Sequence, residues 1–117
     1  GNGVFTEARN RLEADSEANI WVIGVDRDQT EEGEWSGGNF TLTSTIKDTG
    51  SAIVAITEQS MDTEFPGGEL VEYGLADETV DITRGNLDDE TWATIEDAKQ
   101  QIIDGEIDVP EFSYSAE

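Results

Sequence analysis

The sequence predicts an α/β fold, in which helices pack on a mainly parallel sheet, and three observations support this class. Apolar residues recur at helical spacing in three segments, near residues 4–12, 52–61 and 92–103. Residues 20–25 form an unbroken apolar run, which is typical of a parallel strand covered on both faces. Helical and strand patterns alternate along the chain, and this alternation favours the α/β class.

The first half of the chain predicts one helix and two strands. The helix is expected to follow the turn Gly1-Asn2-Gly3, and its apolar face consists of Val4, Phe5, Ala8 and Leu12. The buried strand over residues 20–25 comes next, and the polar segment 27–39, rich in Gly and Glu, is expected to be a loop. Residues 40–46 alternate in character and predict a short strand or an extended connector.

A second helix and two further short strands are expected after residue 50. The apolar stripe of this helix consists of Ala52, Ile53, Ile56 and Met61. Residues 65–68, which contain Pro and two Gly, break the helix. Residues 69–73 and 80–82 are the strand candidates, and a turn separates them.

The third helix has the clearest boundaries. Asp88 predicts its N-cap, Gly105 lies just past its end, and Pro110 lies beyond. Its expected buried face consists of Trp92, Ile95, Ala98, Ile102 and Ile103. Only one strand is strongly apolar, so the predicted sheet is thin for three helices. We therefore expect part of a larger unit, or a small sheet that a partner completes.

The composition excludes several classes of function. The 117 residues carry 28 acidic and 6 basic side chains, a formal net charge of −22. No nucleic-acid partner is expected, because such a partner requires a positive surface. The sequence has no Cys and no His, which excludes disulfides, Cys/His zinc sites, thiol nucleophiles and a Ser-His-Asp triad. No metal site and no cofactor are expected, and no apolar stretch approaches the ~18–20 residues of a membrane helix.

The acidic residues are dispersed between periodic apolar segments, which favours a folded domain with an acidic surface over a disordered tail. Lysine is scarce, since Lys47 and Lys99 are the only two. This composition resembles that of proteins from extreme halophiles, with an acidic mesophilic protein as the alternative. We expect the fold to gain stability as salt rises from about 0.1 M toward molar, because ions screen the self-repulsion of the surface.

Asp26 is the strongest candidate for a ligand-binding residue. It follows the apolar strand directly, and open α/β sheets bind ligands outside the carboxyl ends of their strands. Its two oxygens can accept from both hydroxyls of a vicinal diol, although a loop-capping role would leave the same pattern. Lys47 is a lone cation after the hydroxyl-rich residues 43–45. It can donate to ligand oxygens, pair with Asp26, or be an ordinary surface lysine.

Two other segments have weaker patterns. The turn Gly1-Asn2-Gly3 can hold an anion or a ligand ring through free backbone N–H groups, or be a plain turn. It is not a dinucleotide fingerprint, because Thr6 stands where the third glycine belongs. The acidic run that begins at Asp26 is not a calcium loop, because Glu31 and Gly37 stand where such a loop requires glycine and glutamate.

The aromatic residues and the remaining carboxylates give no specific site. Trp35 and Phe40 lie in a polar segment, where they can stack on a flat ligand or cover a helix. Trp21 and Trp92 fall on apolar faces and are expected in the core. No pair of carboxylates stands out among the 28 as a general acid and base, so a glycosidase-like reaction has no specific support.

Residues 21–29, with the sequence WVIGVDRDQ, resemble the signature of the basic membrane protein family of ABC-transporter substrate-binding lipoproteins, which contains the purine nucleoside receptors. Further segments are similar to the family in the same order, namely residues 1–5, 42–47, 73–75 and 102–110. Arg27 departs from the family pattern, which usually has a small residue there. The resemblance covers nearly the whole chain.

This resemblance implies a type I periplasmic-binding-protein fold, in which two α/β lobes joined by crossover strands close over a nucleoside. Family members are longer, so residues 1–117 are expected to be the C-terminal portion of such a protein, mainly the C-terminal lobe with the last crossover segment. The implied partners are a nucleoside, purine in preference, the N-terminal portion of the same protein, and an ABC permease. The implied location is extracytoplasmic, with a lipid anchor to the membrane.

The resemblance also assigns roles to residues. It implies that Asp26 accepts hydrogen bonds from the ribose hydroxyls and that Lys47 donates to the ribose. The turn formed by Gly1, Asn2 and Gly3 would line the pocket near the base. No covalent chemistry is expected, so the protein is not expected to be an enzyme. The alternatives are a ligand-sensing domain of a regulator or receptor with the same fold, an acidic hydrolase, and a fragment without a function of its own.

Overall fold

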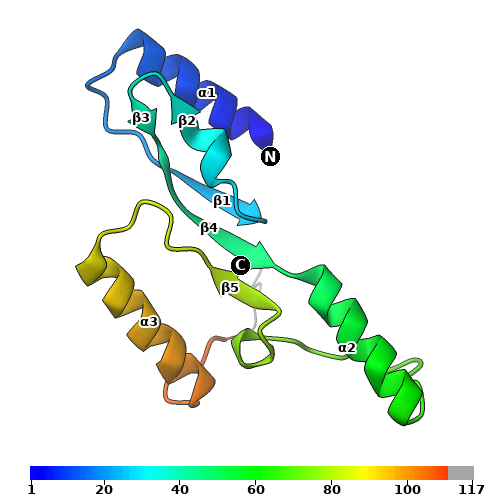
Figure 1. Cartoon of the computed structure of the whole chain (residues 1–117). Helices are drawn as coiled ribbons and strands as arrows, with labels where there is room; N and C mark the ends of the chain where they lie inside the picture. Colours follow the sequence, from blue (N-terminus) through cyan, green and yellow to red (C-terminus); the bar gives the residue numbers. More distant parts are fainter. Residues whose placement is uncertain (111–117) are drawn as a thin grey trace, which may run out of the picture.

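The structure, a computed structural model, describes residues 1–110 and contains a three-stranded sheet with helices beside it (Figure 1). The strand order is β1-β4-β5, with β1 parallel and β5 antiparallel to the central β4. The elements are α1 (Asn2–Ala14), β1 (Val22–Asp26), η1 (Thr30–Gly33), β2 (Glu34–Trp35), β3 (Gly38–Asn39), β4 (Thr41–Lys47), α2 (Thr49–Asp62), η2 (Leu75–Asp77), β5 (Val80–Ile82) and α3 (Asp89–Ile103). The predicted α/β class is confirmed.

The central strand β4 is buried although its sequence is rich in hydroxyl groups. Thr41 and Ser44 are fully buried, and Thr43 is nearly so. Each hydroxyl has a partner: that of Thr41 donates to the Gln29 carbonyl at 3.3 Å, and that of Thr43 donates to the Thr83 carbonyl. Buried polar groups are tolerated when they are hydrogen-bonded, and this condition is met here. The segment predicted as a short strand or connector is therefore the middle of the sheet.

The hydrophobic core lies between α1 and one face of the sheet. The predicted helical face is confirmed at Phe5, Ala8 and Leu12, which are buried, whereas Val4 is exposed. The ring of Phe5 packs on Phe40, with centroids 5.9 Å apart. Val22 from β1 completes this cluster.

The opposite face of β1 is bare, which corrects the prediction of a strand covered on both sides. Successive side chains of a strand point to opposite faces, so Ile23 and Val25 point away from α1. Val25 is 56% exposed and Ile23 is equally open. Trp21, expected in the core, directly precedes the strand and is 50% exposed.

Helix α2 points away from the sheet (Figure 1), and none of its residues is buried by the rest of the described chain. Its predicted apolar stripe exists, but Ile53 is 67% exposed and Met61 more so. The radius of gyration is 18.3 Å. A compact domain of this length would have about 13 Å. The described residues therefore leave apolar surface uncovered.

Helix α3 confirms the predicted boundaries but not the predicted degree of burial. The Asp88 side chain accepts a hydrogen bond from the Thr91 N–H at 2.7 Å, and Gly105 adopts a left-handed φ of 79° just past the helix. Its apolar residues are only partly covered by the rest of residues 1–110. Trp92, expected in the core, is half-buried. No helix within residues 1–110 has the length and apolar character to cross a membrane.

Two other predictions about local structure were wrong. Residues 69–73 do not form a strand. Segment 27–39 is not a plain loop, because it contains the 3-10 helix η1 and the small hairpin β2–β3. This hairpin and η1 connect the parallel strands β1 and β4.

Candidate functional site

The candidate site lies where β1 and β4 end. Parallel strands present their carboxyl ends at one edge of a sheet, so Asp26, the last residue of β1, lies close to Lys47, the last residue of β4. The Lys47 Nζ is 3.1 Å from the Asp26 Oδ1. Of the roles that the sequence left open for Lys47, the structure shows the pairing with Asp26. Both side chains remain 66% exposed, so the pair is accessible to a ligand.

The backbone at Asp26 has an unusual conformation. Its φ is 74°, in the left-handed region that non-glycine residues rarely adopt and that Asp tolerates better than most. This conformation turns the chain sharply out of β1 into the segment that begins at Arg27. The candidate ligand residue therefore stands at a tight corner of the chain.

Two open hollows meet at the ion pair. An apolar hollow of about 530 Å³ lies between the bare sheet face and α3, and a more polar one of about 770 Å³ lies beyond the strand ends. Asp26, Ile46 and Lys47 line both. Small-molecule sites commonly have volumes of roughly 300–1,000 Å³. The arrangement can thus present a carboxylate acceptor and an ammonium donor to a ligand of that size.

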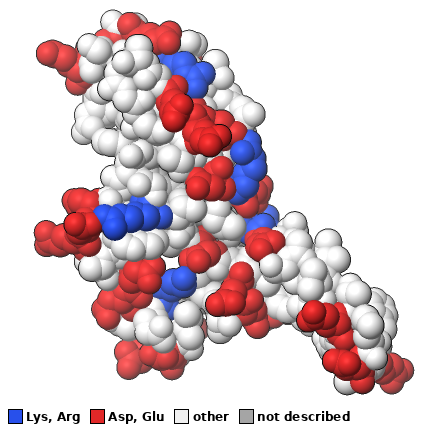
Figure 2. All heavy atoms as spheres, in the orientation of Figure 1, with Lys and Arg blue, Asp and Glu red and all other residues white. Residues whose placement is uncertain are grey.

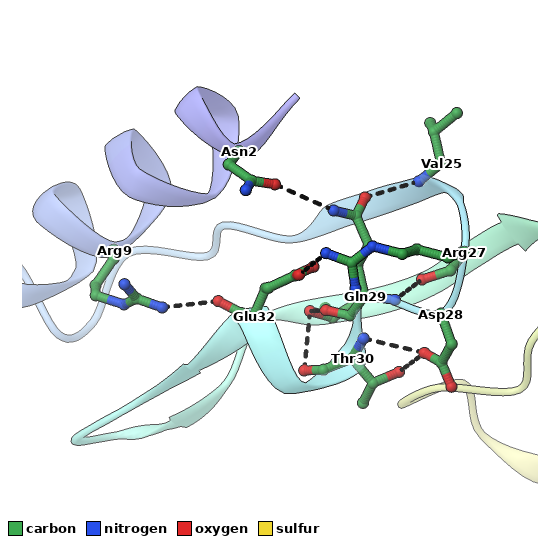
Figure 3. A network of polar contacts seen from close by, with 10 residues as sticks. Asn2, Arg9, Val25, Arg27, Asp28, Gln29, Thr30 and Glu32 are labelled. Atoms are coloured by element: carbon green, nitrogen blue, oxygen red, sulfur yellow. Dashed lines mark hydrogen bonds and ion pairs between the residues drawn. The ribbon is translucent and has the colours of Figure 1, made fainter.

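Gln29 connects this corner to the rest of the site (Figure 3). Its side-chain Oε1 accepts from the Val25 N–H at 3.0 Å, and its Nε2 donates to the Asn2 Oδ1 at 3.4 Å. Its backbone N–H donates to the Ser44 Oγ at 3.1 Å. The predicted site residue Asn2 is therefore linked to the end of β1. Sequence reasoning did not single out Gln29, although it closes the WVIGVDRDQ segment.

The two glycines of the predicted turn lie elsewhere. Gly1 caps α1, Asn2 begins the helix, and Gly3 lies in its first turn. Gly1 and Gly3 are exposed and have open space where a side chain would extend. Gly3 lines a different hollow, together with Trp21, between α1 and β1. The structure thus brings together Asp26, Lys47 and, through Gln29, Asn2.

The segment after Asp26 is held by its own polar contacts (Figure 3). Arg27 pairs with Glu32, and Arg9 donates to the Glu32 carbonyl oxygen at 2.7 Å. Hydrogen bonds from the Thr30 hydroxyl and backbone N–H lower the pKa of Asp28 below its ordinary value of 3.8. Within residues 1–110, no three carboxylates converge in an arrangement that could hold a metal ion.

The aromatic residues weighed as stacking groups lie away from the ion pair. Phe40 is buried in the core against α1, and Trp35 packs beside that core. The surface around the site is acidic: Figure 2 shows Asp and Glu side chains over the visible face, with the few basic side chains next to them. One such contact is the ion pair between Lys99 and Asp81, at 2.9 Å.

Comparisons with known proteins show the family to which this chain is similar. A sequence model of the family described as ABC transporter substrate-binding protein PnrA-like matches residues 1–113. The CD4+ T-cell-stimulating antigen of Listeria monocytogenes is 42% identical over 118 residues, which cover 95% of this chain and 33% of the relative. The ABC transporter nucleoside-binding protein BmpA of Lactococcus lactis is 40% identical over 116 residues, covering 94% and 33%.

A more distant relative is the basic membrane protein B of Borreliella afzelii, 37% identical over 92 residues, which cover 77% of this chain and 25% of the relative. The chain spans about a third of the length of the two more similar relatives.

Proposed function

Because the chain belongs to the family of PnrA-like ABC transporter substrate-binding proteins, we propose that it forms part of the nucleoside-binding subunit of an ABC transporter. The family consists of extracytoplasmic binding proteins rather than enzymes, and the Lactococcus relative is named as nucleoside-binding. The observation that carries the proposal is the Asp26–Lys47 pair at the shared carboxyl edge of β1 and β4.

The chemistry of the pair suits a ribose. The Asp26 carboxylate only accepts hydrogen bonds, and its two oxygens match the two adjacent hydroxyls of the sugar. The Lys47 ammonium has three donors, and contact with Asp26 leaves donors free for ligand oxygens. In the open state water screens both charges. A bound nucleoside that excludes this water would strengthen each hydrogen bond to the pair.

We further propose that residues 1–117 are the C-terminal portion of a longer protein, whose remaining part supplies the opposite wall of the cleft. Relatives are about three times as long. The bare face of β1 at Val25 and the uncovered helix α2 at Ile53 provide apolar surface for that part to cover. A second copy of this chain is a poorer occupant, since two chains of net charge −22 repel each other.

In this proposal, transport depends on closure of the two lobes over the nucleoside. The nucleoside contacts both lobes only in the closed state, so its differential affinity moves the population toward closure. The closed protein then delivers the nucleoside to an ABC permease. A lipid anchor holds the subunit at the outer face of the membrane, which keeps the captured ligand near the permease.

The test is calorimetric binding of guanosine and inosine to the full-length protein. Asp26→Ala removes both diol acceptors, and we expect a loss of about 2 kcal/mol, roughly thirtyfold in affinity. A 2′,3′-dideoxynucleoside lacks the diol, so its affinity for the full-length protein should be weak and should change little in the variant.

Asp97→Ala is the matched control. It removes the same charge from the exposed face of α3, outside both hollows, and should leave affinity unchanged. Equal guanosine affinity in Asp26→Ala and the unsubstituted protein would refute the site. The absence of nucleoside binding by the unsubstituted protein would refute the function.

A further inference from the structure

Gln29 is hydrogen-bonded to α1, β1 and β4, yet it does not line either hollow beside the ion pair. It is 7% exposed, so it lies beneath the site rather than in it. Both ends of its side-chain amide are hydrogen-bonded, one to the Val25 N–H and one to the Asn2 Oδ1 (Figure 3). A buried amide with both ends bonded is fixed in one orientation.

The bonds of Gln29 act on the residues next to the ion pair. Val25 immediately precedes Asp26, whose left-handed φ of 74° makes the corner at the end of β1. The side-chain oxygen of Gln29 holds the Val25 N–H at the start of that corner. If this acceptor were lost, the partly buried Val25 N–H would have to find another partner, and the corner carrying the Asp26 carboxylate would shift.

The same residue also holds the strand that ends in Lys47. The backbone N–H of Gln29 donates to Ser44 on β4, at 3.1 Å, and its carbonyl accepts from the Thr41 hydroxyl at 3.3 Å. One residue therefore ties the end of β1 to β4 across the sheet. The relative position of Asp26 and Lys47 depends on these ties as well as on the strand pairing.

The sequence leaves space for this arrangement at Gly24. A Cβ atom at that position would lie 2.4 Å from the Ser44 Oγ and 2.9 Å from the Gln29 Cβ. Both distances are too short for any residue larger than glycine. The absence of a side chain at Gly24 therefore allows Gln29 to pack against the strands directly below the site.

We propose that Gln29 is a positioning residue of the nucleoside site: it sets the geometry of the Asp26 carboxylate relative to Lys47 without contacting the ligand. This inference rests on the function proposed above. It predicts that the effect of Gln29 on affinity passes through Asp26, whereas a residue that only supports the fold would affect affinity whether or not Asp26 is present.

A double-mutant cycle in the full-length protein separates these roles. Gln29→Met removes both side-chain hydrogen bonds at similar volume, and guanosine affinity should fall about tenfold. In the Asp26→Ala background the same substitution should cost about twofold or less, because the group that it positions is gone. Gln29→Leu removes the same two hydrogen bonds without placing a charge at this 7% exposed position, so it should show the same pattern, and it replaces Gln29→Met if the latter fails to fold. Gln100→Met, on the exposed face of α3, is the matched control and should have no effect.

The outcomes distinguish the inference from the function. If the unsubstituted protein binds guanosine and Gln29→Met costs the same factor in both backgrounds, Gln29 supports the fold only and the inference is wrong. If Gln29→Met has no effect in either background, the inference is also wrong, while the proposed function stands. If the unsubstituted protein binds no nucleoside, the function fails and the inference fails with it.

Discussion

The Nζ atom of Lys47 lies 3.1 Å from the Oδ1 atom of Asp26, because the two residues end neighbouring parallel strands. Both side chains are two-thirds exposed. Ion pairs this exposed contribute about 0–1 kcal/mol to folding, since water screens the charges and two long side chains lose freedom. The position of the pair at the strand ends therefore matters more for ligand binding than for stability.

The first prediction separates these two effects at Lys47. Lys47→Met removes the ammonium but keeps most of the aliphatic side chain, so the free energy of unfolding should change by less than about 1 kcal/mol. Guanosine affinity should fall roughly tenfold, because a charged donor to the ligand is lost. Denaturant unfolding and calorimetry on the same preparation measure both quantities. Arg11→Met breaks an equally exposed pair with Glu7 and serves as the control for stability alone. A large loss of stability in Lys47→Met without a loss of affinity would contradict this prediction.

The second prediction concerns salt. With a net charge of −22, the folded surface repels itself strongly in dilute buffer. The Debye length falls from about 10 Å at 0.1 M to about 3 Å at 1 M salt, so added ions should relieve most of this repulsion. We expect the melting temperature to rise between these concentrations of NaCl. An equal concentration of a neutral osmolyte controls for general solute effects. A melting temperature that stays level or falls with NaCl would show that the acidic surface is not an adaptation to high salt.

The third prediction concerns acid. Hydrogen bonds from the Thr91 side chain and backbone lower the pKa of Asp88 below its ordinary value of 3.8. A carboxyl whose pKa is lower in the folded state stabilises the fold fully above its ordinary pKa, and this contribution is lost as pH falls through the folded-state value. Stability should therefore decline as pH drops below about 3.8.

Asp88→Asn tests this linkage. Asn is an equally good N-cap but does not titrate. The variant should resemble the unsubstituted protein near pH 6 and lose less stability between about pH 5 and pH 3, as measured by urea unfolding. Asp48, which caps α2 through Ser51, provides an independent carboxyl with the same sign of pKa shift. Identical acid dependence in Asp88→Asn and the unsubstituted protein would rule out this role for the cap.

The fourth prediction concerns the uncovered apolar surface. The Ile53 side chain is exposed to solvent in the structure of residues 1–110, and we expect the rest of the longer protein to cover it. A cysteine at Ile53 should react quickly with a soluble thiol reagent in the isolated chain and at least about tenfold more slowly in the full-length protein, because local opening would be required. Asp62→Cys is the control, since nine residues of helix place it on the opposite face of α2. Equal reaction rates for the cysteine at position 53 in both proteins would mean that this face of α2 is not an internal interface.

The parts of the fold that local chemistry determines could be predicted from the sequence. The N-cap at Asp88 and the left-handed Gly105 fix the ends of α3, because both act within one helical turn. The face of α1 was predicted through Phe5 and Leu12, since helical spacing gathers apolar residues on one side. The Asp26–Lys47 pair was one of three roles that the sequence left open for Lys47, and the parallel pairing of β1 with β4 is what brings the two residues together.

The remaining features depend on contacts between distant segments. The apolar run at residues 20–25 predicts a strand, but it does not show which face of that strand the rest of this chain covers. The predicted burial of Trp21 and Val25 was therefore wrong. The central position of β4 in the sheet could not be predicted from its hydroxyl-rich sequence, because the burial of this strand depends on hydrogen-bond partners such as Thr83. Gln29 was missed for the same reason: its role appears only when Asn2 and Ser44 are brought to it.

The hydrogen-bonded set formed by Gln29, Ser44 and Asn2, with Gly24 beside it, limits how this sequence can change over generations. Replacement of Ser44 by a residue without an acceptor would leave the Gln29 N–H without its partner, and any side chain at Gly24 would displace both residues. Substitutions at these positions should therefore arise together among homologous sequences rather than singly. We therefore expect covariation between positions at the start of α1 and in β4, although these positions lie far apart in the chain.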